Sequence, residues 1–111
     1  MFPTRKIADD VIVYLRGRID HQDSKKIEDF LVNEISANRG CDLIINLKDV
    51  EYLSSSGLRI FLSTQRILIK NGQNLKLSNL QEPVEKLLEA AQLKMHLKIY
   101  EDERDALDDI S

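Results

Sequence analysis

In the stretch Val50-Glu51-Tyr52-Leu53-Ser54-Ser55-Ser56-Gly57-Leu58-Arg59, three serines separate a predicted strand from a predicted helix. The apolar run before it, residues 43–47 (LIINL), is typical of a buried strand. After it, apolar residues recur with the period of a helix over residues 58–70. In α/β proteins, functional residues commonly follow the carboxyl ends of strands. The three serines are therefore the first candidate site.

The residues before this stretch predict a hairpin. Residues 4–8 and 11–15 are strand candidates joined by the turn at Asp9-Asp10. Gly17 permits a bulge near the end of the second strand, and Asp20 opens a polar loop. In a sheet, Asp20 and the serines would both lie beyond the carboxyl ends of strands.

Helices and strands alternate through the rest of the chain. A helix is expected from residue 23 or 24, either of which can cap it, to about residue 38, before Gly40. Later elements are expected at residues 75–77 (strand), from about Pro83 (helix), 97–100 (strand) and 103–110 (helix). This order predicts an α/β fold: a mixed sheet of about five strands, antiparallel at the N-terminal hairpin and parallel later, with about four helices.

The composition limits the classes of function. The 111 residues include 16 Lys and Arg and 19 Asp and Glu, for a net charge of −3, which argues against binding to nucleic acid. One domain spanning residues 1–111 is expected from this length. No apolar run approaches the roughly 20 residues that cross a bilayer, so we expect no membrane insertion and a cytoplasmic protein. One cysteine, Cys41, offers no internal disulfide or metal-ligand spacing, and we expect no metal site and no cofactor.

The helix over residues 58–70 has two predicted sides. At 100° per residue, one side gathers the residues expected to face the core: Leu58, Phe61, Leu62, Gln65, Leu68 and Ile69. Roughly opposite lie Ser56, Ile60, Ser63 and Ile67. Exposure of Ile60 and Ile67 beside a hydroxyl at the helix start predicts a partner-binding surface.

Several segments resemble the STAS domain of bacterial anti-sigma factor antagonists. Residues 43–47 and 52–58 are similar to its apolar strand and following Asp-Ser-Ser/Thr-Gly-Leu turn. Leu15-Arg16-Gly17-Arg18-Ile19-Asp20 looks like the family's Gly-x-Leu-Asp segment. Residues 79–93 resemble its third helix, and Asp105-Ala106-Leu107 its acidic end. The resemblance extends over nearly the whole chain and implies a STAS-like fold.

The resemblance also implies a phosphorylation switch. A serine kinase of the GHKL ATPase type, which is also the anti-sigma factor, would phosphorylate the residue before the glycine, here Ser56, with Ser55 as a secondary candidate. The unphosphorylated protein would bind this partner and so free a sigma factor. A PPM-type Ser/Thr phosphatase would reset the switch. The chain would then be a substrate and a binding partner, not an enzyme.

Two positions depart from the family pattern. Ser54 stands where the family usually has Asp, and Asn46 where it often has Asp. Ser54 can still cap the helix as Asp does. Gly57 permits close approach of a partner's backbone. The residues expected to contact a partner are Asp20, Ser54, Ser55, Gly57, Ile60 and Ile67.

Other interpretations remain open. The serines can serve only to cap and start a helix, and Gly17 and Asp20 can be simple turn residues. The chain would then be a STAS-type scaffold or accessory subunit, in a signalling assembly or in lipid transport, without a phosphorylation switch. A serine hydrolase is disfavoured, because residues 53–57 lack the first glycine of a nucleophile elbow. The only histidines, His21 and His96, are interpreted as loop or surface residues.

Overall fold

The computed structural model describes residues 2–109 and contains one five-stranded sheet in the order β1-β2-β3-β4-β5. β1 (Thr4–Ile7) pairs antiparallel with β2 (Asp10–Ile19), whereas β3 (Asp42–Leu53), β4 (Leu75–Ser78) and β5 (Lys98–Tyr100) continue the sheet in parallel. The predicted mixed α/β fold and its N-terminal hairpin are confirmed.

β2 and β3 extend well beyond their apolar runs. Two register shifts interrupt their pairing, one on each side of Arg16-Gly17, and Gly17 has a φ of 87°. The extra residue at each shift lies on β3, as Glu51 does between Val50 and Tyr52, and Gly17 lies opposite on β2 with a backbone that glycine adopts without steric cost. Beyond the bulge the strands pair again until Ile19 lies opposite Leu53. Both strands therefore end at the same edge of the sheet, immediately before Asp20 and Ser54.

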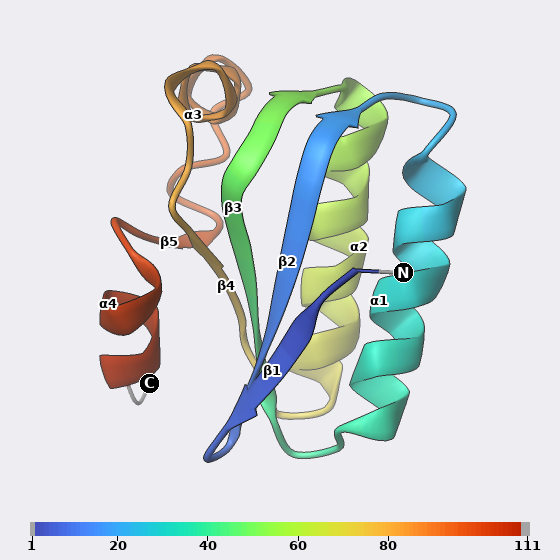
Figure 1. Ribbon diagram of the computed structural model, residues 1–111, viewed down its shortest axis with the longest axis vertical. Coiled ribbons are helices and arrows are strands. Elements are labelled where there is room, and N and C mark those ends of the chain that lie inside the picture. Colours follow the sequence, from blue (N-terminus) through green and yellow to red (C-terminus); the bar gives the residue numbers. More distant parts are fainter. Residues whose placement is uncertain (1, 110–111) are drawn as a thin grey trace.

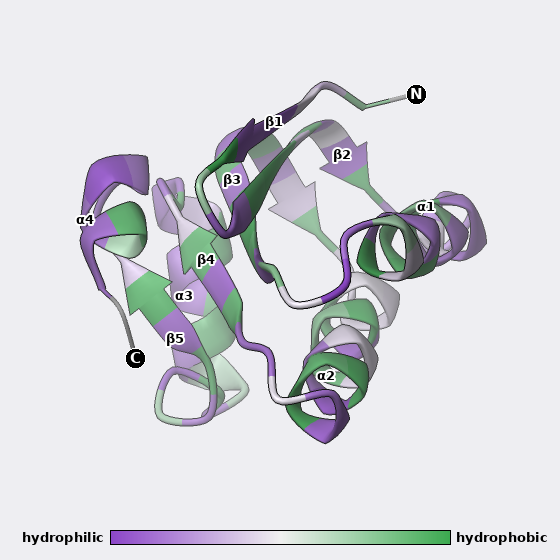
Figure 2. Cartoon of the chain, turned by 90° about the horizontal axis from the view of Figure 1, so that it is seen from below, coloured by the Kyte–Doolittle hydropathy of each residue, from purple (hydrophilic) through white to green (hydrophobic). Residues whose placement is uncertain are grey.

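The helices cover the two faces of the sheet unequally. α1 (Ser24–Ala37) and α2 (Ser55–Lys70) lie side by side on one face, and α3 (Glu82–Ala90) joins the same core near the carboxyl ends of the strands (Figure 1). The short α4 (Glu103–Asp108) covers the opposite face, where Ala106 packs with Ile12 and Ile44. Viewed from below, the sheet separates α4 from α1 and α2 (Figure 2).

The helix boundaries follow local signals in the sequence. α1 ends one residue before Asn38, and Gly40 has a φ of 85°, as expected of a residue that ends a helix. Pro83 lies in the first turn of α3 as predicted. α4 begins at Glu103 as predicted, but ends at Asp108, and Ile110 lies outside the described residues. Within residues 2–109, no helix is long and apolar enough to cross a membrane.

The predicted sides of α2 are wrong at two positions. Ile60 is only 3% exposed, and Ile69, expected in the core, is 60% exposed. The reason is that α2 packs against α1 as well as the sheet, so its buried surface is wider and turned toward α1. Ile60 is therefore not an exposed partner contact. Ile67 is 36% exposed, as predicted.

Candidate functional site

Ser54 links the end of β3 to the start of α2. Its backbone N–H donates to the carbonyl oxygen of Ile19 at 2.9 Å, which extends the pairing of β2 with β3. Its Oγ accepts a hydrogen bond from the Gly57 N–H at 3.2 Å, as the N-cap residue of α2. The predicted cap is confirmed, so Ser preserves here the structural role that Asp has in the family pattern.

Gly57 allows the first turn of α2 to pack closely on the strand ends. A Cβ atom at this position would lie 2.4 Å from Cδ1 of Leu53 and 3.4 Å from Cγ2 of Ile19. The close approach that glycine permits is thus made by the chain's own side chains. Gly57 is itself buried, so it does not present an exposed surface to a partner.

The Ser56 hydroxyl has a hydrogen-bond partner within the chain that the sequence does not predict. Its Oγ lies 2.8 Å from Nδ1 of His21, in hydrogen-bond contact, although the two residues are 35 positions apart. Ser56 is partly exposed, and Ser55 is exposed. Of the three serines, Ser54 therefore turns inward to the backbone, whereas Ser56 presents its hydroxyl to a histidine.

The loop that carries His21 is organised by Asp20. The Asp20 carboxylate accepts a hydrogen bond from the Gln22 N–H at 3.0 Å, and its carbonyl accepts from the Asp23 N–H at 3.2 Å. The Ser24 hydroxyl donates to the same carbonyl. These bonds give Asp20 a role in the turn that places His21. Its predicted contact with a partner is untested.

The sequence predicts a loop or surface position for His21, and the structure confirms it, with His21 exposed in the turn between β2 and α1. The sequence relates His21 to Ser56 only indirectly. Asp20 and Ser54 each follow a strand, and parallel strands end at a common edge of the sheet. Knowledge of the register between Ile19 and Leu53 would have placed His21 beside the serines. A sequence pattern alone does not fix that register.

An open hollow lies beside the Ser56 hydroxyl, between the start of α1 and the first turns of α2. Its volume is about 330 Å³, and its lining residues are His21, Ser24, Lys25, Glu28, Ser56, Arg59 and Ile60. The hydrogen bond from the Lys25 ammonium to Asp29, at 3.1 Å, raises the pKa of Lys25. Glu28 accepts a hydrogen bond from the Ser63 hydroxyl at 3.3 Å. The hollow thus combines donors for an anion with one carboxylate.

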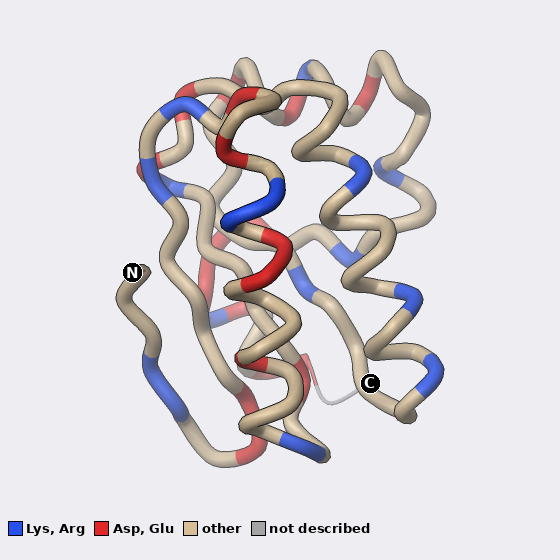
Figure 3. The backbone as a smooth tube through the Cα atoms, turned by 90° about the vertical axis from the view of Figure 1, so that its right-hand side faces the viewer, with Lys and Arg blue, Asp and Glu red and all other residues tan. Residues whose placement is uncertain are grey.

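The exposed side of α2 is basic. The helix contains three charged side chains, all of them positive, Arg59, Arg66 and Lys70. Their spacings of seven and four residues place them on one face of the helix, which continues from Ser56. Only blue positions mark α2 in Figure 3, whereas α1 carries both signs. This face differs in sign from the whole chain, whose net charge is −3.

Asn46 lies away from the serine turn. It is 4% exposed, and its side-chain amide donates to Oε1 of Glu103 on α4 at 3.1 Å. The Tyr14 hydroxyl donates to the same oxygen at 2.7 Å. An Asp at position 46 would instead place a carboxylate against Glu103. The departure from the family pattern thus matches a local contact that holds α4.

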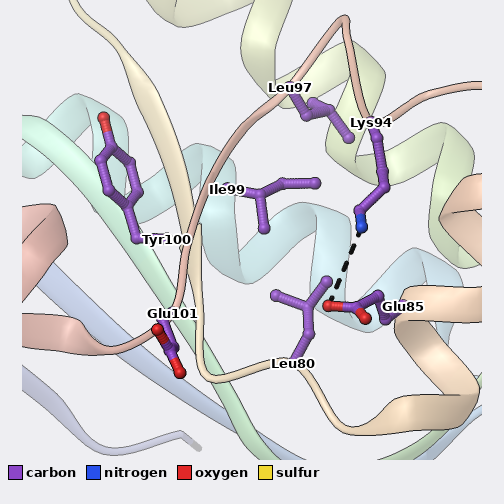
Figure 4. A pocket seen from close by; sticks show the side chains of 7 residues that line it. All are labelled: Leu80, Glu85, Lys94, Leu97, Ile99, Tyr100 and Glu101. Carbon is purple, nitrogen blue, oxygen red and sulfur yellow. Dashed lines mark ion pairs between the residues drawn. The ribbon is translucent and has the colours of Figure 1, made fainter.

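A second cavity lies between α3 and β5, on a different part of the surface. It is lined by Leu80, Glu85, Lys94, Leu97, Ile99, Tyr100 and Glu101 (Figure 4). The Lys94 ammonium lies 4.0 Å from Glu85 and 3.0 Å from Glu89, so its charge is already compensated. Among residues 2–109, no group of three His, Cys, Asp or Glu side chains is arranged to hold a metal ion.

Comparisons with known proteins agree with this architecture. The family model of the STAS domain matches residues 2–106. The anti-sigma-B factor antagonist of Bacillus subtilis (strain 168) is 39% identical over 85 residues, covering 77% of this chain and 76% of that protein. The anti-sigma F factor antagonist of Paenibacillus polymyxa is 28% identical over 101 residues, covering 90% and 86%.

A solved structure shares the fold. The anti-sigma factor antagonist SpoIIAA in its unphosphorylated form superposes with a TM-score of 0.80 at 22% identity, covering 97% of this chain and 94% of that one. At this identity the likeness concerns the fold.

Proposed function

The chain belongs to the STAS domain family, and from that premise we propose that it acts as an anti-sigma factor antagonist-like regulator. When unphosphorylated it binds a serine kinase of the GHKL ATPase type that is also an anti-sigma factor, and phosphorylation of Ser56 ends that binding. A PPM-type Ser/Thr phosphatase removes the phosphate. The chain works in the cytoplasm as a substrate and binder, and the kinase supplies the catalytic groups, ATP and metal.

This proposal rests mainly on the different positions and hydrogen bonds of the three serines in the structure. Ser54 is engaged in capping α2, whereas the Ser56 hydroxyl is directed to the surface beside His21. Ser56 is also the residue immediately before the glycine, as in the family pattern. Ser55 is exposed and remains the secondary phosphate acceptor.

A phosphate on Ser56 would change binding without unfolding the protein. The first turn of a helix tolerates negative charge, because its N–H groups and dipole favour an anion. The outer face of α2 has three positive side chains and no negative one. A phosphate adds about −1.5 to −2 charges and leaves this face at roughly +1. A partner whose surface complements the unmodified face would lose attraction and meet a bulky hydrated group.

The proposed partner surface begins at the serine turn and follows α2. It comprises Asp20, Ser54, Ser55 and Ser56 at the turn, and Arg59, Arg66, Ile67 and Lys70 along the helix, whereas Gly57 is buried beneath them. Ile67 is about 16 Å from Ser56 along the helix axis, at 1.5 Å per residue. It offers an apolar contact within an otherwise basic face. The predicted contact at Ile60 is not part of this surface, because Ile60 is buried.

The proposal is tested by phosphotransfer from the cognate kinase with ATP, mapped by mass spectrometry. Wild-type protein and Ser55→Ala should both be labelled at Ser56, and Ser56→Ala should not be labelled. Ser55→Ala is the matched control, since it removes the neighbouring hydroxyl from the same turn. Persistent labelling of Ser56→Ala would show that the acceptor is elsewhere.

Binding to the same kinase supplies the second part of the test. Ser56→Asp should weaken binding by roughly a hundredfold, equivalent to about 2.7 kcal/mol, as measured by calorimetry. Unchanged affinity would contradict the charge mechanism. Absence of phosphorylation, together with tight binding of Ser56→Asp to a partner that is not a kinase, would favour the alternative of a STAS-type scaffold or accessory subunit.

A further inference from the structure

We propose that His21, together with Lys25 and Arg59, forms an intramolecular binding site for a phosphate monoester on Ser56. The inference rests on the proposed phosphorylation of Ser56 and adds a group on this chain that recognises the modified side chain. It begins from the contact of 2.8 Å between Nδ1 of His21 and Oγ of Ser56. Any group attached to that oxygen is placed beside the imidazole ring.

Phosphorylation changes what His21 must do in this contact. A serine hydroxyl can donate to a neutral Nδ1 or accept from a protonated one. A phosphoserine dianion has only acceptor oxygens, so Nδ1 must carry a proton for the contact to persist. The form that bears protons on both nitrogens also contributes a positive charge, and hydrogen bonds between charged groups are the stronger kind. A neutral imidazole with its proton on Nδ1 can make this contact, and the imidazolium, which takes its second proton from solvent, makes it more strongly because it adds a charge.

The surroundings of the hollow supply further positive charge. Lys25 and Arg59 line it from α1 and α2, and Ser24 adds a hydroxyl. Lys25 already bonds to Asp29 on the outer side of α1, so part of its charge is compensated.

Three carboxylate side chains lie in the loop of His21 or line the hollow beside it. Asp20 and Asp23 belong to its own loop, and the Asp20 carboxylate accepts from the Gln22 N–H. On α1, Glu28 lines the hollow and accepts from the Ser63 hydroxyl of α2. The lining of the hollow thus holds two permanently positive side chains, Lys25 and Arg59, and a third positive charge when His21 is protonated, against the one carboxylate of Glu28.

The cationic groups of this site change the titration of the phosphate. The second pKa of a phosphoserine is near 6. An adjacent cation favours the dianion and lowers the second pKa of the phosphate. The negative charge that opposes partner binding would therefore be fully developed at a lower pH than in an isolated phosphoserine.

The test uses phosphoserine inserted at position 56 during synthesis, so that it does not depend on any kinase. The ³¹P chemical shift is followed from pH 4.5 to 8. The midpoint for wild-type protein should lie roughly half a unit below that for His21→Gln, the size of one partly exposed charge pair. Lys25→Gln and Arg59→Gln should each produce smaller increases. His96→Gln is the matched control, because His96 is also an exposed histidine but lies outside the hollow.

A second control places phosphoserine at position 55, where His21→Gln should leave the midpoint unchanged. Equal midpoints for wild type and His21→Gln with phosphoserine at position 56 would overturn the proposal. His21 is exposed, so its replacement should leave the fold intact, and thermal unfolding of each variant checks this. A lowered midpoint without kinase labelling of Ser56 would contradict the proposed function alone, and labelling with an unshifted midpoint would contradict this inference alone.

Discussion

The absence of one methyl group at Gly57 determines how closely α2 starts above the strands. Leu53 and Ile19 occupy the space that a Cβ atom would need, and Leu53 is itself 3% exposed. Ser56, the preceding residue, is thereby held at the sheet edge where it meets His21. The sequence suggests only that Gly57 allows a close approach, whereas the structure shows that packing against Leu53 requires the absence of a side chain there.

Gly57→Ala is expected to destabilise the protein by about 1–3 kcal/mol, because Leu53 has no free space to move into. In an open helix position the same change would stabilise by roughly 0.5–1 kcal/mol. The sign of the change in the free energy of unfolding, measured with urea, therefore shows whether Gly57 is confined by packing. Ser55→Ala, at an exposed position in the same turn, should shift stability by no more than about 0.5 kcal/mol. A stabilising Gly57→Ala would mean that Leu53 does not confine this turn.

The helix α4 is held mainly by polar contacts, although it covers apolar residues. Glu103 accepts hydrogen bonds from Tyr14 and Asn46, and the Arg5 guanidinium lies 3.7 Å from it. The Lys76 ammonium, 1% exposed, donates to the Ala106 carbonyl at 2.9 Å. A helix of six residues has little stability of its own, so these contacts fix its position.

Tyr14→Phe should cost about 1 kcal/mol at neutral pH, because Glu103 loses a donor. Burial, and then the hydrogen bond to Glu103, raises the pKa of Tyr14 above its ordinary value of 10.0. The folded state thus holds this proton more tightly than the unfolded state. The contribution of Tyr14 is complete below pH 10 and declines as the pH rises through the raised pKa.

The stability difference between wild type and Tyr14→Phe should therefore shrink above pH 10. Urea unfolding at pH 7 and near pH 10.5 measures it. Tyr52→Phe provides the control, since Tyr52 is 40% exposed and contacts Arg18 through its ring. A difference that stays constant across this range would argue that Tyr14 does not hold its proton through the contact with Glu103.

Over the whole molecule, α2 presents a local face with three positive side chains and no negative one, within a chain of net charge −3. The opposite face of the sheet carries α4, whose first turn contains Glu103 and Asp105. The two faces therefore present different electrostatic surfaces to a partner. A local patch of this kind steers binding even when the net charge has the other sign.

Binding of the proposed kinase partner should therefore weaken as salt rises, in spite of the net charge of this chain. Arg66→Gln combined with Lys70→Gln should reduce affinity at low salt and flatten the salt dependence. Calorimetry at several salt concentrations measures both effects. Lys86→Gln on α3 is the control, because Lys86 pairs with Glu82 at 2.8 Å away from this surface. Equal salt dependence of the double variant and wild type would exclude α2 as the charged contact.

Local sequence signals were sufficient to predict the strands, the helices and the capping of α2 at the serine turn. Alternating and helical periods predicted the strands and helices, Gly40 and Pro83 marked helix ends, and Ser54 was correctly expected to cap α2. These signals suffice because caps, turns and periods act among residues a few positions apart. The same information predicted the mixed sheet with its N-terminal hairpin.

Contacts between distant residues depended on the tertiary structure. The register of β2 with β3 joins His21 to Ser56 across 35 positions, and the docking of α4 joins Asn46 to Glu103 across 57. The packing of α1 against α2 buries Ile60, which a single-helix pattern assigned to the surface. Register and helix packing arise from the sum of many weak contacts, so no short motif encodes them. The sequence thus predicted Ser56 as the site, and only the folded chain places His21 beside it.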